Sequence, residues 1–292
     1  MARFRHILYP VDFSARCLAV RPFVAAMARR MQAPITLLHS IPIPRGWFGG
    51  VGVEGAYPSF FDFPSLERDA ETRLTSVRGE VPFKTLDVNC VVKTGDPAIA
   101  ITELANESNA CLIMIPTHGY GKFRNLLLGS VTAKVLHDAI AAVWTDAHAE
   151  IHEANPSVDP KRILCAIELN QNDEPLIRQA LELAGNDPSL VRLVHAVPVE
   201  EARPQKYFSL EFDRFLMDVA KERIAELQSK MGIELQSCVR AGPVAPVVRQ
   251  AAVVHGSDLI VIGRGVVRET MGRLRTNAYA IIREAPCPVL SF

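Results

Sequence analysis

Residues 110 to 139 are the strongest candidate for chemistry, because their types and spacing are suited to hold an anionic group. The apolar run Cys111 to Ile115 is followed by Pro116-Thr117-His118-Gly119, nine further residues, and then Gly129-Ser130. We interpret this order as a buried strand, a glycine-containing loop and a helix that begins at Gly129 and Ser130. The first N–H groups of a helix have no partners within it, and the helix dipole favours negative charge there. The stretch is therefore compatible with phosphate binding, although glycine in such a loop can also serve the backbone conformation alone.

The carboxylate of Asp12 directly follows a second apolar run, Ile7 to Val11. At the end of a buried strand, a carboxylate accepts hydrogen bonds either from a ligand or from the backbone of its own turn. His39 and His195 each lie near the end of a later apolar run, and this recurrence favours a structural role over a catalytic one. The sequence therefore predicts Asp12 as a binding residue and neither histidine as a catalyst.

Motifs for enzymatic chemistry are missing from the sequence. It contains no G-x4-G-K-[ST] phosphate loop, no G-x-S-x-G nucleophile elbow and no H-E-x-x-H zinc motif. Rapid phosphoryl transfer also needs a positioned water, charge neutralisation and usually Mg²⁺ ligands, and the sequence places none of these. We therefore predict no catalytic residue and no metal held by protein side chains.

The composition indicates a globular chain in a reducing compartment. Its 292 residues are enough for two domains, and its 32 basic and 32 acidic residues cancel, so no overall charge attracts nucleic acid or a membrane. The six cysteines are scattered without a C-x-x-C pair, which favours buried reduced thiols. No run approaches the roughly 20 apolar residues of a membrane span, and the N-terminus lacks the apolar region of a signal peptide. We expect a soluble cytoplasmic protein with neither a nucleic-acid nor a membrane partner.

Alternating apolar runs and helix-like segments must position these residues. The first half of the chain is predicted to form strands at 7–11, 35–41, 85–92, 110–115 and 142–145, and helices at 14–31, 65–77 and 98–106. This alternation is typical of right-handed β-α-β crossovers in a doubly wound parallel sheet. Ser14 is the expected N-cap of the first helix, in which Pro22 predicts a kink or a late start.

Two segments do not fit this alternation. Residues 42 to 64 are rich in glycine, proline and aromatic residues and are too long for an ordinary connection. They suit a lid over a ligand and a surface that packs on a partner equally well. Residues 147 to 160 are polar, include Pro156 and Pro160, and resemble a linker. We therefore expect one domain at 1–147 and another at 160–292.

The same pattern begins again after this linker. The matching segments are Ile163 to Glu168 with Ile7 to Asp12, Leu193 to Pro198 with Leu37 to Pro42, Ala241-Gly242-Pro243 with Thr94-Gly95-Asp96, Asp258 to Ile262 with Cys111 to Ile115, and Pro286 to Val289 with Ile140 to Val143. Their spacing is nearly constant along both halves, which indicates an internal duplication.

Several motifs occur in a fixed order: Ile7-Leu8-Tyr9-Pro10-Val11-Asp12-Phe13-Ser14, Leu37-Leu38-His39, Gly95-Asp96-Pro97, Gly119-x9-Gly129-Ser130 and Ala285-Pro286-Cys287-Pro288-Val289. With these motifs, both halves resemble universal stress protein domains, and the whole chain resembles a tandem member of that family. The resemblance implies an α/β fold of two tandem doubly wound domains, each a five-stranded parallel sheet of order 3-2-1-4-5 with helices on both faces. In that order strands 1 and 4 are neighbours, and their crossovers leave in opposite directions, which opens a crevice for a ligand.

The resemblance also implies a set of binding residues. Members that bind ATP carry G-x2-G-x9-G-[ST] after strand 4 and an aspartate after strand 1. Asp12, with Pro10 and Val11, would then face adenosine, and the Ser40 backbone would touch adenine. The phosphate loop would comprise Pro116, Thr117, His118, Gly119, Gly129 and Ser130, with the N–H groups of Val131 and Thr132. Pro116 replaces the first glycine of the motif and has no N–H to donate. The implied cofactor is ATP, accompanied by Mg²⁺.

The second half departs further from this motif. Glu168 replaces the strand-end aspartate, Gly263-Arg264-Gly265 is one residue short of G-x2-G, and Arg275-Thr276 stands in place of Gly-Ser. The side chain of Arg275 would obstruct close approach of a phosphate, or would bind an anion directly. We favour a second domain that has lost nucleotide binding.

The leading hypothesis is a cytoplasmic stress-response protein that binds ATP in its first domain, hydrolyses it slowly at most, and acts as a regulatory or interaction module. The alternative is a nucleotide-free tandem scaffold for a protein partner or an apolar small molecule, which Pro116 and the aromatic 42 to 64 segment favour. A third hypothesis is that the chain is an enzyme of the wider adenine-nucleotide α-hydrolase group. Single-domain members of the family pair through their fifth strands, so we expect 143–145 and 289–291 to pair as an internal pseudo-dimer, with a further homodimer left open.

Overall fold

A computed structural model describes residues 4–43, 62–107, 111–117, 128–146, 159–197, 210–264 and 273–292. The elements of the first half are β1 (His6–Pro10), α1 (Ala15–Met31), β2 (Ile35–Ile41), α2 (Phe63–Gly79), β3 (Val88–Thr94), α3 (Pro97–Glu107), β4 (Cys111–Met114), α4 (Ser130–Asp138) and β5 (Ala142–Thr145). Those of the second half are β6 (Ile163–Ala166), α5 (Asp173–Leu183), a 3₁₀ turn (Pro188–Leu190), β7 (Val191–Val197), α6 (Leu210–Met231), β8 (Gln236–Ala241), α7 (Val244–His255), β9 (Leu259–Ile262), α8 (Arg273–Glu284) and β10 (Val289–Ser291).

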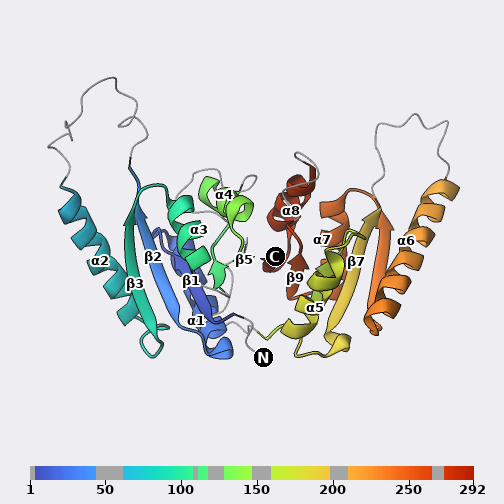
Figure 1. Cartoon of the computed structure of the whole chain (residues 1–292), viewed down its shortest axis with the longest axis horizontal. Helices are drawn as coiled ribbons and strands as arrows, with labels where there is room; N and C mark the ends of the chain where they lie inside the picture. The colour runs from blue at the N-terminus through green and yellow to red at the C-terminus, as the bar shows by residue number, and fades with distance from the viewer. Residues whose placement is uncertain are drawn as a thin grey trace, which may run out of the picture.

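The described strands form one ten-stranded sheet in the order β3-β2-β1-β4-β5-β10-β9-β6-β7-β8, with helices on both faces (Figure 1). Within each half, every pair of neighbouring strands is parallel, and β1 lies between β2 and β4, where Ile7 pairs with both Ile35 and Leu112. The predicted order 3-2-1-4-5 is thus present in the first half and repeated in the second. The point where the connections leave in opposite directions lies between β1 and β4.

Burial on both faces explains why β1 is an uninterrupted apolar run. Ile7 and Tyr9 join the core beneath α1, whereas Leu8, pointing to the opposite face, joins the core beneath α3 and α4. All three side chains have 0% exposure. Because helices cover both faces of a parallel sheet, no face of its central strands needs polar residues.

The helix α1 corrects one prediction and confirms another. Ser14 is its N-cap, with its Oγ accepting the Cys17 N–H at 3.1 Å. The helix then runs on through Pro22, so the predicted late start is wrong. Pro22 has no N–H for the Leu18 carbonyl, and the Nε–H of Arg21 donates to that carbonyl instead at 2.9 Å.

Boundaries around α2 and β3 also differ from the predicted ones. The helix begins at Phe63, two residues earlier than predicted, because Asp62 caps it by accepting the Ser65 N–H at 3.1 Å. The strand begins at Val88 rather than at residue 85, since the Phe83 N–H bonds the Glu80 carbonyl at 2.9 Å in a turn that precedes it. Phe83 is 1% exposed, so burial of this ring holds the turn in place.

The two halves meet where β5 pairs with β10, the single antiparallel pairing among the described strands. Trp144 lies opposite Leu290, and the Thr145 and Ser291 hydroxyls donate to the carbonyls of Val289 and Val143 at 3.4 and 3.2 Å. Each contact thus has a counterpart related by a local two-fold axis, as in an isologous interface. The expected pairing of 143–145 with 289–291 is present.

Within the described ranges, no helix has both the length and the apolar character needed to cross a membrane.

Candidate functional site

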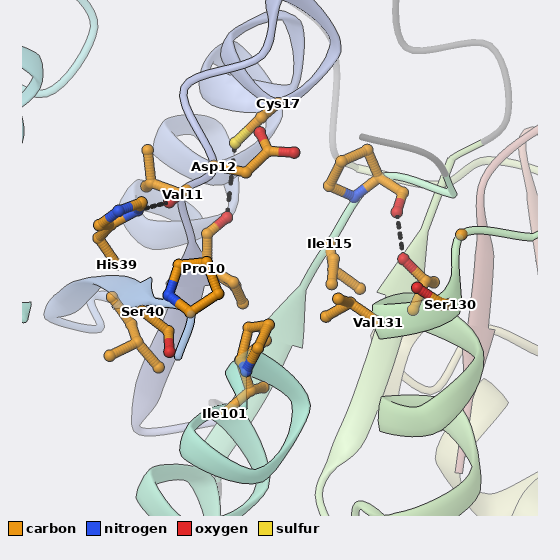
Figure 2. Close-up of a pocket in the computed structure, with 16 residues that line it drawn as sticks. Pro10, Val11, Asp12, Cys17, His39, Ser40, Ile101, Ile115, Ser130 and Val131 are labelled. Carbon is orange, nitrogen blue, oxygen red and sulfur yellow. Dashed lines mark hydrogen bonds between the residues drawn. The ribbon is translucent and has the colours of Figure 1, made fainter. Parts of the chain in front are cut away.

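A cavity of about 430 Å³ opens at the carboxyl ends of the first-half strands, between β1 and β4 (Figure 2). This is the crevice that the strand order creates, and its volume lies in the range of small-molecule sites. Its lining consists of Pro10, Val11, Asp12, Cys17, Leu38, His39, Ser40, Pro42, Pro97, Ile101, Ile115, Pro116, Gly129, Ser130, Val131 and Thr132. Most of these side chains are apolar, and the polar ones lie towards opposite sides.

Most of the residues predicted as binding residues line this cavity. Figure 2 shows Asp12, Val11 and Ser40 on one side of it and Ser130 and Val131 on the other. Thr117 is buried and does not line it. His118 and Gly119 lie outside the described residues, as do residues 44–61 and the linker residues 147–158.

Asp12 caps its own turn. Its Oδ1 accepts the N–H of Ser14 at 2.9 Å, while the side chain itself stays exposed at the mouth of the cavity. Phe13, between them, has a φ of 61°, which bends the chain sharply from β1 into α1. The Asp12 carboxylate therefore stabilises the turn after β1 and is also presented to the cavity.

His39 ties the ends of β1 and β2 together. Its Nδ1–H donates to the Val11 carbonyl at 2.7 Å, and its ring lies 4.7 Å from that of Phe13. In the second half, His195 makes the same bond to Ile167 at 2.9 Å. Because a carbonyl only accepts, this bond assigns the proton to Nδ1 in each ring. The repetition in both halves agrees with the structural role expected of these histidines.

Other wall residues were not predicted. Cys17 is buried, and burial, followed by the negative charge of Asp12, raises the pKa of its thiol to about 12, so it stays a neutral thiol near pH 7. Its Sγ–H donates to the Pro10 carbonyl at 3.5 Å. Pro97 and Ile101 come from successive turns of α3. The Gly95-Asp96-Pro97 motif was the available signal for them, since it starts the helix that faces the cavity.

The N-terminus of α4 has no side-chain cap. Its N-cap is Gly129, from which no side-chain hydrogen bond reaches the first turn. By contrast, Ser14 caps α1, and Asp96 Oδ1 accepts the Ala98 N–H at 2.9 Å at the start of α3. An uncapped first turn that borders a cavity offers N–H groups and the positive end of a helix dipole to an anion.

Pro116 and Thr117 hold this first turn against β4. The Thr132 hydroxyl donates to the Pro116 carbonyl at 2.9 Å, and the Gly129 N–H donates to the Thr117 carbonyl at 2.9 Å. The N–H of Gly129 is thus used within the protein, whereas Ser130 lies exposed at the cavity. The structure therefore gives Pro116 and Thr117 the task of positioning α4.

Lys134 brings a positive charge to the same region. It follows Ser130 by four residues and so lies on the same face of α4. Its Nζ donates to Asp96 Oδ2 at 2.9 Å, which joins α4 to the start of α3. This hydrogen bond lowers the pKa of the Asp96 carboxyl below its usual value, so the carboxylate is ionised at neutral pH.

The matching turn of the second half is closed by a buried carboxylate. Leu169, with a φ of 60°, repeats the conformation of Phe13. Asp173 is 2% exposed and accepts the N–H groups of Glu168 and Asn170 at 3.0 and 2.8 Å. Burial raises the pKa of Asp173, an effect that these hydrogen bonds oppose. The side chain of Arg275 lies outside the described residues.

The described side chains offer few donors for a metal ion. Among the described residues, no group of three or more histidine, cysteine, aspartate or glutamate side chains could hold a metal ion. Of the described residues that line the cavity, Asp12 is the one carboxylate. Any divalent cation here would depend mainly on oxygens of the ligand and on water.

Comparisons with known proteins agree on one family. The model of the universal stress protein family matches residues 3–145 and again residues 160–292. Universal stress protein A homolog 2 of Coxiella burnetii is 29% identical over 136 residues, which are 45% of this chain and 93% of that protein. A universal stress protein of Methanocaldococcus jannaschii is 27% identical over 143 residues, 46% of this chain and 88% of that protein.

Solved structures support the fold along the whole chain. A universal stress protein from Archaeoglobus fulgidus has a TM-score of 0.68 at 19% identity and covers 98% of this chain and 97% of its own. A protein of unknown function from Pseudomonas aeruginosa PAO1 has a TM-score of 0.62 at 16% identity, with 99% of this chain and 92% of its own covered. At such identities the likeness concerns the fold alone.

Proposed function

Because the chain belongs to the universal stress protein family, we propose that it is a stress-response protein whose first half binds ATP in the cavity between β1 and β4. The observation that carries this proposal is the arrangement of that cavity. An apolar slot lies between the Asp12 carboxylate and the uncapped first turn of α4. An adenine nucleotide has one part suited to each of these features: a flat base for apolar walls, sugar hydroxyls for a carboxylate and an anionic tail for a helix N-terminus.

In this proposal, each side of the cavity binds a different part of the nucleotide. Pro10, Val11 and the Ser40 backbone pack against adenosine, and Asp12 accepts hydrogen bonds from its hydroxyl groups. The phosphates lie at the first turn of α4, where the N–H groups of Ser130, Val131 and Thr132 face an anion without a Cβ at Gly129. His118 and Gly119 complete this loop in the proposal.

Mg²⁺ would accompany the nucleotide rather than occupy a site of the protein. The described lining supplies the carboxylate of Asp12, one oxygen of which already accepts the Ser14 N–H. Phosphate oxygens and water would provide the remaining ligands, as is common for Mg²⁺ at nucleotides. When bound, the ion would neutralise phosphate charge.

The proposed role is that of a regulatory or interaction module in the cytoplasm. The described cysteines Cys17, Cys90, Cys165, Cys238 and Cys287 are free thiols, as expected in a reducing compartment. The proposed domains are 1–147 and 160–292, with nucleotide binding lost in the second. The reciprocal contacts of β5 and β10 support an internal pseudo-dimer, in which one chain supplies both subunits of a two-fold pair.

Calorimetry tests the proposal directly. We expect the purified chain to bind ATP with Mg²⁺, and Asp12→Ala to weaken binding by about 10-fold or more, because a charged hydrogen bond is lost. Asp218→Ala is the matched control, since that carboxylate pairs with Lys221 on α6, remote from the cavity, and should leave the affinity unchanged. An absence of ATP binding, or full affinity in Asp12→Ala, would contradict the proposal.

A second candidate is a nucleotide-free scaffold that holds an apolar small molecule or a protein partner. The predominantly apolar lining and the absence of an N–H at Pro116 favour it. Mass spectrometry of the gently denatured purified protein separates the two candidates. Co-purified ATP supports the first, whereas an apolar ligand in its place supports the second.

A further inference from the structure

The second half contacts α4, the helix whose first turn borders the cavity of the first half. Across the centre of the molecule, α4 faces α8 (Figure 1), and the Tyr279 hydroxyl donates to the Ala133 carbonyl at 2.9 Å. Beyond β9, the Arg264 Nη1–H donates to the carbonyls of Ala139 and Leu136 at 2.8 and 3.4 Å. Its Nη2–H donates to the Ala141 carbonyl. The second half thus contacts both the middle and the C-terminal end of α4, a helix of the first half.

Arg264 is suited to hold the end of a helix. The last carbonyls of a helix lack partners within it and carry the negative end of its dipole, so a cation with several donors satisfies both. Burial lowers the pKa of Arg264 to about 10, which leaves it protonated at neutral pH. Its backbone N–H donates to the Phe292 carbonyl at 2.8 Å, which fixes the base of the side chain beside β10.

The two halves differ in the residues at the positions that make these contacts. When Arg275-Thr276 is aligned with Gly129-Ser130, Tyr279 is the counterpart of Ala133, whose methyl group cannot return the contact. When Asp258 to Ile262 is aligned with Cys111 to Ile115, Arg264 is the counterpart of Thr117, which donates to the Asp146 carbonyl of its own half at 3.4 Å. In a symmetric arrangement, the residues aligned with Tyr279 and Arg264 would make the same two contacts to α8.

The helix that receives this support is short. It has nine residues, too few to persist without packing, so tertiary contacts decide where its first turn lies. From its own half it has the Thr132 bond to Pro116, the Lys134 pair with Asp96, and a buried face that includes Val135. Tyr279 adds a contact at the middle of the helix, and Arg264 bonds carbonyls at its C-terminal end.

We propose that Arg264 and Tyr279 are positioning residues through which the second half holds α4, and thereby sets the affinity of the first-half cavity for the anionic part of its ligand. The identification of that part as a triphosphate rests on the proposed function. The second half then contributes to the site without binding a nucleotide of its own.

The test compares Arg264→Gln with Arg223→Gln. Arg223 is a matched control because it also donates to a carbonyl, that of Leu169, at 2.8 Å, within the second half. We expect Arg264→Gln to raise amide hydrogen exchange of residues 130–138 by about 10-fold and to weaken ATP binding roughly 5- to 20-fold. Binding of adenosine should change by less than about 2-fold, since adenosine does not reach α4. A merely structural role would weaken both ligands alike.

A second variant keeps the test decisive if Arg264→Gln fails to fold. Tyr279→Phe removes one hydroxyl and should change exchange and ATP affinity in the same direction by about 2- to 3-fold. Unchanged exchange and unchanged ATP affinity in the folded variants would overturn the inference and leave the proposed function intact. If the wild-type chain binds neither ATP nor adenosine, the proposed function fails. In that case a rise in the exchange of residues 130–138 would support only the hold of the second half on α4, and no rise would refute the inference.

Discussion

Pro116 shapes the cavity through its carbonyl and its ring rather than through an N–H group. The carbonyl accepts the Thr132 hydroxyl, which holds the first turn of α4 in place, and the ring forms part of the wall. A glycine at this position would keep the carbonyl and add a donor. A substitution of Pro116 by glycine can therefore distinguish two influences on ligand binding: the position of α4, which the carbonyl maintains, and the number of N–H groups available to the ligand.

Pro116→Gly should tighten ATP binding by about 3- to 10-fold if the phosphates lie in this loop, because one N–H is gained. Stability should fall by less than about 1 kcal/mol, since glycine frees the unfolded chain. Calorimetry and urea unfolding measure the two changes. Pro188→Gly, at the 3₁₀ turn of the second half, is the control for the loss of a proline alone. Unchanged ATP affinity would mean that the phosphates lie elsewhere.

Three helices of the first half begin near the cavity, and each has a different start. Ser14 caps α1, Asp96 caps α3, and α4 begins at Gly129 without a side-chain hydrogen bond. The Lys134 pair with Asp96 then ties the uncapped helix to a capped one. The helix that faces the proposed anion, α4, is thus the one whose first turn has no side-chain cap.

Lys134→Met tests this tie through its dependence on pH. The folded-state pKa of Asp96 lies below its unfolded value, so the pair stabilises the protein above that value, 3.8, and loses its effect as the pH falls through the folded-state pKa. We expect the variant to lose less than about 1 kcal/mol at pH 7, because both side chains are partly exposed. Urea unfolding at pH 7 and at about pH 3 measures the difference, which should shrink at the lower pH. An equal loss at both values would assign the effect to packing.

At the scale of the whole molecule, the β5–β10 junction joins the two halves into one sheet. Trp144 lies on the junction of β5 and β10, is 3% exposed, and packs on Phe23 of α1 with 5.3 Å between ring centroids. Its partner across the local two-fold axis is Leu290, which is 2% exposed. This junction makes one continuous sheet of two duplicated units, so its loss should affect both halves.

Trp144→Ala should lower the free energy of unfolding by about 3 to 5 kcal/mol, because a large buried ring leaves a cavity between the halves. Urea unfolding followed by circular dichroism measures this change. Ile140→Ala is the control in the same region, since Ile140 is 84% exposed and its truncation should stay within about 0.5 kcal/mol. A loss below about 1 kcal/mol in Trp144→Ala would show that the junction contributes little.

Much of the fold could be predicted from local residue patterns. The apolar runs that became β1 and β2, the Ser14 cap and the repeat after the linker are written in neighbouring residues, because burial on both faces and capping act over a few positions. Asp12 and Gly129 were predicted from a strand end and a loop, and Ser40 from the family resemblance, and all three line one cavity. The start of β3 was misjudged, as was the late start of α1 given as one outcome at Pro22, since Phe83 and Arg21 make contacts that spacing does not reveal.

Some contacts between residues far apart in the chain were decided by tertiary structure alone. Arg264 was noted as a departure from a glycine motif, yet its guanidinium lies on carbonyls about 125 positions earlier in the chain. Nothing in the motif indicates this, because the contact exists only once β5 and β10 have paired and brought α4 and α8 together. The sequence thus predicted several of the residues that surround the cavity, whereas the pairing of the two halves decided which contacts from the second half hold its wall.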